Sequence, residues 1–392
     1  MRPSELFSDP RAARFAWAGW VALFLTMAAI IAHDSTRSVL AVYRFGSTQW
    51  IAGRTLYEFT GIGGFTYLPH AAILFIPFAL LPPVAGEVLW RLVNIAVFAV
   101  GLSGFARLAG ERSGKDFFPL MTLVTLPLAW GCARNGQATL MMTGFMLLAV
   151  ADLGRSRWWM STLWLALAVA VKPLAIVLVL LILAMERHMT LRLAVGMTVL
   201  LLFPFATQQT TYVAGQYAAC LQNMALSAHV GVVAHGWTTP FTALWVAGID
   251  VPERIQTVIR LTAAVATLVL LWMARRRQGG APAAVHAYSL AAVYLILFSP
   301  RTENNTYVML GPVIGLFLSK AALAEERTGK AVLLGGILTA LIGSRQLEHL
   351  LTPHAADSWL SPLMAVFVAV YLLTELFAKR EGRRDGADVL SS

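Results

Sequence analysis

The stretch WWMSTLWLALAVAVKPLAIVLVLLILAM, residues 158–185, decides the fold class of this chain. Its one charged residue is Lys172, and it is longer than the roughly 20 apolar residues that cross a bilayer as one helix. The proline at position 173 disfavours helical backbone at Lys172. We therefore expect two half-helices that meet at Lys172 within a membrane.

Similar apolar runs lie on both sides of this stretch. The 392 residues are 58% hydrophobic and 13% charged, and the mean hydropathy of +0.68 is too high for a soluble protein of this size. The runs predict an all-α fold, a polytopic membrane helical bundle of about ten to twelve transmembrane helices, beginning with residues 15–32. Residues 70–81 are too few for a simple span and would be re-entrant or paired with another short piece, and residues 208–239 indicate a polar loop.

Basic residues form short clusters between the apolar runs. If the N-terminus and the clusters at 107–115, 155–157, 187–192, 275–277, 320–330 and 379–384 share one side, 20 of the 30 Lys and Arg residues are cytoplasmic. We therefore expect a multi-pass protein of the plasma (inner) membrane with both termini cytoplasmic. The loops around Asp34, Asn135, Lys172 and Arg301 fall on the outer face. The net charge of +10 therefore indicates a membrane protein with lipids as partners, and nucleic acid is not expected as a partner.

The chain reads as one integral-membrane domain, residues 1–378, followed by a basic and disordered cytoplasmic tail, residues 379–392. Residues 34–66 form an outer loop in which residues 39–51 predict one or two helices on the membrane surface. Cys132 and Cys220 form no CxxC pair, so neither a disulfide framework nor a zinc site is expected.

Charged residues inside or beside apolar runs are candidates for a functional site, because a charge at membrane depth costs several kcal/mol, or roughly 3 on insertion scales. Asp34 follows the first helix and suits a general base or, alternatively, a solvated charge at a helix end. Arg37, Arg44 and Arg54 suit a phosphate or the headgroups of anionic lipids. Lys172 needs a partner or a water-filled cavity, unless it reaches the interface by snorkelling.

Two further polar breaks interrupt the apolar pattern. Residues 134–137, RNGQ, contain an Asn-Gly turn dipeptide. Residues 299–307, SPRTENNTY, offer Arg301 and Glu303 as an ion pair, or Glu303 with two asparagines for sugar hydroxyls. His229 and His235 match no metal motif and read as loop residues. Because no P-loop or Rossmann fingerprint is present, neither ATP hydrolysis nor nucleotide-sugar binding in a Rossmann domain is expected.

The order of several motifs resembles glycosyltransferase family 87. These motifs are Tyr43, Gly53, Leu56-Tyr57, Phe65-Thr66-Tyr67-Leu68-Pro69, Pro77, Leu81-Pro82, Asn135-Gly136-Gln137, Lys172-Pro173 and Ser299-Pro300, within residues 34–310. The resemblance implies the C-type membrane glycosyltransferase fold and transfer of a hexose, mannose first, from a polyprenyl-phosphate-linked donor to a lipid or glycan acceptor. In the family the outer-loop aspartate usually precedes the "VY" pair, at about Val39, and histidines often follow the "SP" motif, where this chain has Asn304 and Asn305.

The resemblance also implies roles for the candidate residues. Asp34 is the first candidate for the base, followed by Glu303 and then Glu58. The candidates for binding the donor phosphate are Arg37, Arg44, Lys172 and Arg301. The candidates for contacting the sugars are Tyr43, Tyr67, Asn135, Gln137, Asn304 and Asn305. We expect no metal and no cofactor, because cationic side chains can stabilise the leaving phosphate.

Three other functions fit part of the pattern. A transporter or flippase of lipid-linked sugars would share the basic cavity but would not need Asp34. A transferase similar to an O-antigen ligase would also use lipid-linked donors, but would move a whole glycan. A membrane scaffold would tolerate the loss of all these charges.

Overall fold

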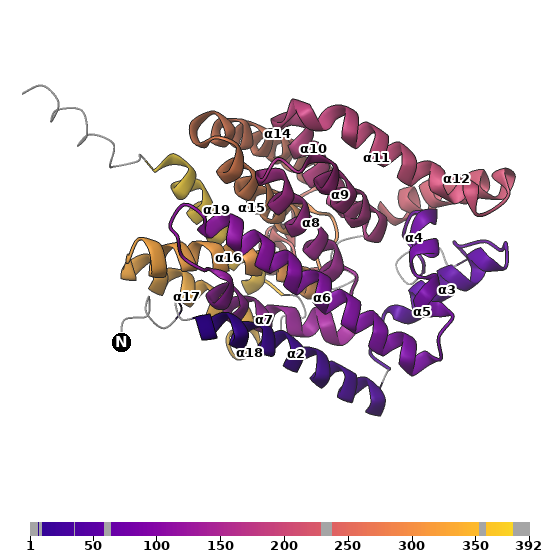
Figure 1. Cartoon of the computed structure of the whole chain (residues 1–392), viewed down its shortest axis with the longest axis horizontal. Coiled ribbons are helices and arrows are strands. Elements are labelled where there is room, and N and C mark those ends of the chain that lie inside the picture. The colour runs from indigo at the N-terminus through magenta and orange to yellow at the C-terminus, as the bar shows by residue number, and fades with distance from the viewer. Residues whose placement is uncertain are drawn as a thin grey trace, which may run out of the picture.

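The computed structural model describes residues 7, 10–34, 36–58, 64–228, 237–352 and 358–378, which fold into helices without strands (Figure 1). The first half contains α2 (Pro10–His33), α3 (Leu40–Ile51), α4 (Pro69–Leu74), α5 (Ile76–Ala79), α6 (Pro83–Gly110), α7 (Phe118–Asn135), α8 (Thr139–Gly154), α9 (Trp158–Val171) and α10 (Ile176–Met185). The second half contains α11 (Thr190–Leu202), α12 (Thr210–Ala228), α13 (Pro240–Val246), α14 (Glu253–Gln278), α15 (Gly280–Phe298), α16 (Leu310–Ser319), α17 (Thr328–Ile342), α18 (Ser344–Leu351) and α19 (Leu360–Phe377). Short helices join these: η1 (Pro173–Ala175), η2 (Arg187–Met189), η3 (Phe203–Ala206), η5 (Asn304–Met309) and the π-helical η6 (Lys320–Ala324).

The described residues include seven helices that are long and apolar enough to cross a membrane. They are α2, α6, α14, α15, α19 and the composite helices Arg187–Ala206 and Asn304–Ala324. The pair α17–α18, bent by 73°, would be an eighth span if it is counted as one. This confirms the all-α polytopic membrane bundle. The count is below the expected ten to twelve because three further apolar helices, Thr139–Gly154, Trp158–Val171 and Pro173–Met185, have only 10–17 residues.

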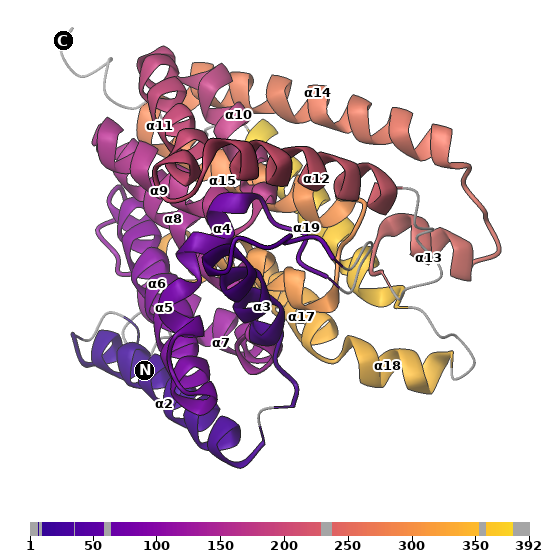
Figure 2. The same ribbon diagram turned by 90° about the vertical axis from the view of Figure 1, so that its right-hand side faces the viewer.

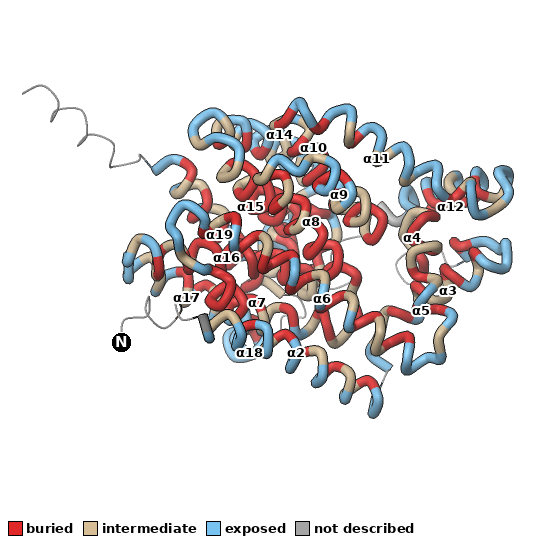
Figure 3. Tube along the Cα trace, in the orientation of Figure 1, coloured by how far each residue is buried: buried red, intermediate tan, exposed pale blue. Residues whose placement is uncertain are grey.

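The helices form a buried centre and a peripheral layer (Figure 3). The best apolar window of α15 is 72% buried and that of Asn304–Ala324 is 78% buried. The corresponding windows of Arg187–Ala206 and α14 are only 17% buried. Because those two helices are apolar as well as exposed, their outer faces are suited to contact lipid.

The backbones of α6 and α8 approach each other closely in the centre of the bundle. A Cβ atom on Gly101 would collide with the backbone oxygen of Gly144, and a Cβ on Gly144 would lie 2.7 Å from the backbone of Phe98. Small residues permit such close packing between membrane helices, which is driven by van der Waals contact. The two glycines therefore fix the distance between α6 and α8.

We expect Gly101→Val to destabilise the bundle by about 1–3 kcal/mol or more, because the added atoms force the two backbones apart. The measurement is the midpoint of thermal unfolding in detergent. Gly335→Val on α17 is the matched control, because no atom lies within 4 Å of a Cβ built there. Equal midpoints for the two variants would contradict this account of the α6–α8 contact.

The expected break at Lys172 is confirmed. Lys172 has extended backbone, with φ −153° and ψ 120°, between the end of α9 and η1. The apolar stretch of residues 158–185 is therefore two half-helices, and the side chain at the break lies half-buried in the bundle.

The segment after α2 and the expected polar loop over residues 208–239 differ in part from the expectation. Residues 39–51 form one helix, α3, and residues 69–79 form the short helices α4 and α5, which agrees with a piece that does not span. The prediction of a polar loop over residues 208–239 is wrong for its first part, which is the 19-residue helix α12. His229, His235 and the tail 379–392 lie outside the described residues.

Helix α12 lies beside α4 (Figures 1 and 2) and holds the segment that follows α3. The amide of Gln216 accepts from the backbone of Leu56 at 2.9 Å, and the hydroxyl of Tyr212 donates to the backbone oxygen of Arg54 at 2.7 Å. The polar residues that suggest a loop therefore belong to a helix and bond to the backbone of residues 54–56.

Candidate active site

Three helix breaks meet at one end of the bundle, where α3, α4 and α5 also lie (Figure 1). Gln137, between α7 and α8, donates to the carboxylate of Glu303 at 3.0 Å. The ammonium group of Lys172 donates to Thr139 at the start of α8 at 2.9 Å. Segments that are far apart in sequence thus bring a carboxylate, an amide and an amine to one place.

The turn between α7 and α8 is built around Gly136. Its φ of +64° lies in the left-handed region that glycine enters without strain. The backbone of Gly136 donates to Ala133 at 3.2 Å and that of Gln137 donates to Cys132 at 3.0 Å, which is the Schellman arrangement of a helix end. The turn ends α7 and sets Gln137 toward Glu303.

Glu303 is the N-cap of the short helix η5. Its side chain accepts from the backbone three residues on, and the hydroxyl of Thr306 accepts from the backbone of Glu303, which makes a capping box. The charge of Glu303 also acts on Lys172, although no hydrogen bond joins the two in the described residues. The carboxylate is half-buried and held by neutral groups, with a cation nearby.

Two tyrosines line the same cluster. The hydroxyls of Tyr43 and Tyr67 lie 3.1 Å apart, and the backbone of Ala138 donates to Tyr43 at 3.3 Å. Burial and the carboxylate of Glu303 raise the pKa of Tyr67 to about 12, so this hydroxyl stays protonated and can donate to a sugar oxygen. The backbone oxygen of Asn135 accepts from Val39 at 3.0 Å, which joins the start of α3 to this turn.

A buried arginine that sequence reasoning missed supports the turn. Arg91 on α6 donates to the carboxylate of Glu87, to Ser38 at 3.1 Å, and to the backbone oxygens of Ala133 at 3.1 Å and Arg134 at 3.0 Å. Its exposed fraction is 1%. The spacing of Glu87 and Arg91, one helical turn apart at the start of an apolar run, was the signal for this pair.

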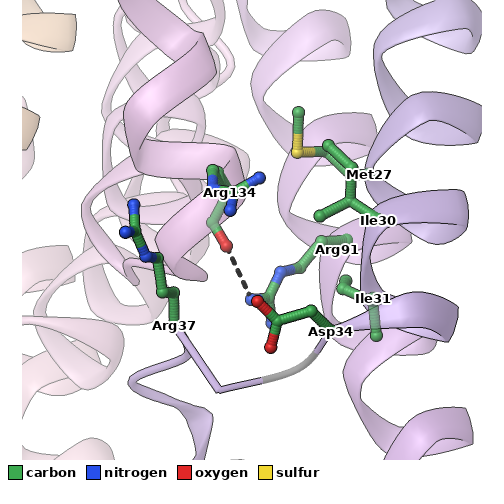
Figure 4. A pocket seen from close by; sticks show the side chains of 7 residues that line it. All are labelled: Met27, Ile30, Ile31, Asp34, Arg37, Arg91 and Arg134. Carbon is green, nitrogen blue, oxygen red and sulfur yellow. Dashed lines mark hydrogen bonds between the residues drawn. The ribbon is translucent and has the colours of Figure 1, made fainter.

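Asp34 lies in a separate, small pocket (Figure 4). The pocket has a volume of about 10 Å³, room for about one water molecule, and is lined by Met27, Ile30, Ile31, Asp34, Arg37, Arg91 and Arg134. Arg91 lines this pocket and also donates to the backbone of Ala133 and Arg134, just before Gln137. Neither Glu303 nor Lys172 is among the described residues that line this pocket.

The carboxylate of Asp34 is exposed and bound by a near neighbour. Thr36 donates to it from the hydroxyl at 2.6 Å and from the backbone at 2.9 Å. These bonds hold the pKa of Asp34 below its ordinary value, and Arg134 and Arg37 act in the same direction. A carboxylate with a lowered pKa accepts a proton less readily. These surroundings therefore stabilise the charged form of Asp34 and make it a weaker general base.

The other expected residues have different surroundings. Arg301 lies 5.9 Å from the ring of Trp237 as a cation–π pair. The amide nitrogen of Asn304 donates to the hydroxyl of Thr238 at 3.0 Å. Its amide oxygen accepts from the guanidinium of Arg345 at 3.0 and 3.2 Å. Asn305 covers Gly131 on α7. Glu58 accepts from Gln49 at 3.2 Å in an exposed position.

Arg44 has structural contacts. Its guanidinium donates to the backbone oxygen of Phe78 at 2.9 Å and to that of Leu81 at 3.0 Å, at the end of α5. Phe78 lies in the last turn of α5 and Leu81 follows the helix, so the side chain acts as a C-terminal cap.

We expect Arg44→Ala to lower the free energy of unfolding by about 1–3 kcal/mol, because the two carbonyls lose their donor. Thermal unfolding in detergent measures the change, with Arg54→Ala as the control because the Arg54 side chain is exposed on the same segment. Unchanged stability together with a higher KM for the donor would assign Arg44 to the phosphate instead.

The comparison with protein families bears on this geometry. The sequence model of glycosyltransferase family 87 matches residues 65–300. The chain belongs to glycosyltransferase family 87. No curated protein matches the chain.

The match to family 87 confirms the family resemblance and makes the chain a membrane glycosyltransferase. The matched residues include Tyr67, the turn at Gly136 and the break at Lys172, and they end just before Glu303. They exclude Asp34, whose place in the family pattern is therefore not set by the match. In a family 87 enzyme, the cluster offers a carboxylate that can accept a proton from a hydroxyl and an ammonium group that can stabilise a phosphate.

Proposed function

We propose that the chain transfers a hexose, mannose first among the candidates, from a polyprenyl-phosphate-linked donor to a lipid or glycan acceptor. The reaction takes place at the outer face of the plasma membrane, with Glu303 as the general base. The observation that carries the proposal is the meeting of Glu303 and Lys172 at helix breaks of a family 87 bundle.

The step follows from the charges. The acceptor hydroxyl attacks the anomeric carbon of the donor sugar, and its proton passes to the carboxylate of Glu303. The bond between the anomeric carbon and the phosphate oxygen breaks, and polyprenyl phosphate leaves with the electron pair. Because the leaving group gains one negative charge, Lys172 stabilises the transition state more than the bound donor.

Lys172 is the first candidate to contact the donor phosphate, since its amine is bound to the single hydroxyl of Thr139 and can bond to further oxygens. Arg37, which lines the Asp34 pocket, and Arg301, two residues before Glu303, are the next candidates. Tyr43, Tyr67 and Gln137 lie around Glu303 and suit sugar hydroxyls. The asparagines 135, 304 and 305 border them.

The basic clusters at the other end of the bundle support an outer active site. Residues of these clusters bond to one another or to residues beside another cluster: Arg155 to Glu111 at 3.0 Å, Arg112 to Gln278 at 3.1 Å, Arg275 to Glu186 at 2.9 Å and Lys320 to Glu375 at 2.9 Å. By the positive-inside rule this end is cytoplasmic, together with both termini. The cluster around Glu303 is then on the outer side.

Asp34 is the second candidate for the base, as the first carboxylate after α2. Membership of family 87 argues against the transporter and the scaffold. An enzyme similar to an O-antigen ligase would transfer a whole glycan. The identity of the donor therefore distinguishes such a ligase from the proposed hexosyltransferase.

The test uses the purified chain in detergent with radiolabelled polyprenyl-phosphate-mannose and a lipid and glycan extract of the source organism's envelope. We expect label to move from donor to acceptor, and to move faster from mannose than from arabinose, galactose or glucose donors. Folded protein that transfers none of the four sugars would overturn the proposal. Transfer of a preassembled glycan from its lipid pyrophosphate would favour the ligase.

A further inference from the structure

An open groove of about 630 Å³ lies at the end of the bundle opposite the candidate active site. Its wall includes Trp158 at the start of α9, residues 183–188 at the end of α10 and in η2, Thr190 at the start of α11, and Arg275 near the end of α14. Both ribbon views place α10, α11 and α14 together (Figures 1 and 2). The volume is in the range of ligand sites.

The groove carries a positive balance of charge. Arg187 and Arg275 line it with one carboxylate, Glu186, which is buried and bound to Arg275 at 2.9 Å. The helices α9 and α11 begin at its wall, and neither has a side-chain cap. Their first backbone N–H groups and positive dipole ends add to the attraction for an anion.

The surface beside the groove is apolar and exposed. Leu191 on α11 is 74% exposed and Leu180 on α10 is 54% exposed. The ring of Trp158 lies 5.7 Å from that of His188, and Arg192 lies 5.6 Å from the ring of Trp159. Tryptophan and arginine at the end of an apolar surface are typical of the membrane interface. An occupant of the groove therefore has hydrocarbon beside it.

We propose that the groove binds the headgroup of an anionic phospholipid, with the lipid phosphate at Arg187 and Arg275 and the acyl chains along α10 and α11. Basic pockets between membrane helices on the cytoplasmic side bind such headgroups. A free anion would use the same arginines, but it would not use the exposed leucines beside them. This site lies apart from the Glu303 cluster and does not depend on the proposed reaction.

The experiment is native mass spectrometry of the full chain in detergent, titrated with dioleoyl phosphatidylglycerol and, separately, dioleoyl phosphatidylcholine. We expect tighter binding of phosphatidylglycerol. Arg187→Ala should weaken that binding about fivefold, which corresponds to about 1 kcal/mol per basic residue. Glu186→Gln should tighten it, because the amide oxygen can still accept from Arg275 while the negative charge is gone.

The control is Arg107→Ala, which removes an equal charge from the same end of the bundle but lies outside the groove. Equal binding of the two lipids, or equal effects of Arg187→Ala and Arg107→Ala, would overturn the proposal. Displacement of phosphatidylglycerol by millimolar inorganic phosphate or by glycerophosphoglycerol would also overturn it, in favour of a site for free anions. A gain of affinity in Glu186→Gln would support the site even if Arg187→Ala fails to fold.

Discussion

Glu303→Gln is expected to lower kcat for sugar transfer by at least about 100-fold, the lower end of the usual contribution of a general base. The substitution keeps the size of the side chain and an oxygen that can accept from Gln137, so the cap of η5 and the turn at Gly136 should remain. Only the ability to take up the acceptor proton is lost. Because Lys172 is unchanged, KM for the donor should change much less than kcat.

Asp34→Asn and Glu253→Gln are the matched comparisons, since each also replaces one carboxylate by an amide. Glu253 is exposed at the start of α14 and should have no effect on transfer. Asp34→Asn should reduce kcat less than tenfold, because Asp34 lies in a pocket whose described lining includes neither Glu303 nor Lys172. Loss of transfer in Asp34→Asn with retention in Glu303→Gln would make Asp34 the base.

Arg91→Ala is expected to destabilise the bundle by about 3–5 kcal/mol. The substitution leaves the carboxylate of Glu87 buried without its cation, and breaking a buried ion pair from one side costs about that much. It also removes the donor to the carbonyls of Ala133 and Arg134, so the turn that positions Gln137 loses its support. The measurements are the midpoint of thermal unfolding in detergent and kcat of the folded fraction.

Arg107→Ala, on the same helix but exposed, is the control and should change stability by about 0.5 kcal/mol or less. The double variant Glu87→Gln/Arg91→Met should recover part of the loss, since it removes both charges and keeps most of the volume. An Arg91→Ala protein with the wild-type midpoint and full activity would show that neither the ion pair nor the turn depends on this side chain.

The sequence predicts the bundle well because apolar runs and proline act locally. The break at Lys172 follows from Pro173, and the end of α7 follows from Asn135-Gly136, so both are visible without tertiary contacts. The grouping of these breaks at one end follows from the basic clusters. The hydrogen bond from Gln137 to Glu303 joins two of these breaks into one site. The sequence alone does not predict this tertiary contact.

The features that the sequence does not reveal share one physical origin, which is the bonding of polar side chains to backbone groups. Arg44 caps α5, and a guanidinium suited to phosphate is equally suited to two carbonyls. Gln216 and Tyr212 give α12 a polar composition, although they serve to hold residues 54–56. Arg91 was missed because it pairs with Glu87 one turn earlier, so that the two charges do not interrupt the helix.

The backbone contact between Gly101 and Gly144 makes α6 and α8 one mechanical unit. Arg91 lies on one of these helices, and the turn with Gln137 leads into the other, so this wall of the site cannot widen by a shift of either helix alone. Evolution of the site toward a bulkier sugar or acceptor would have to act on the facing wall. Glu303, which accepts from Gln137, lies on that side, and the backbone N–H of Thr238 donates to the backbone oxygen of Thr302 beside it at 2.6 Å.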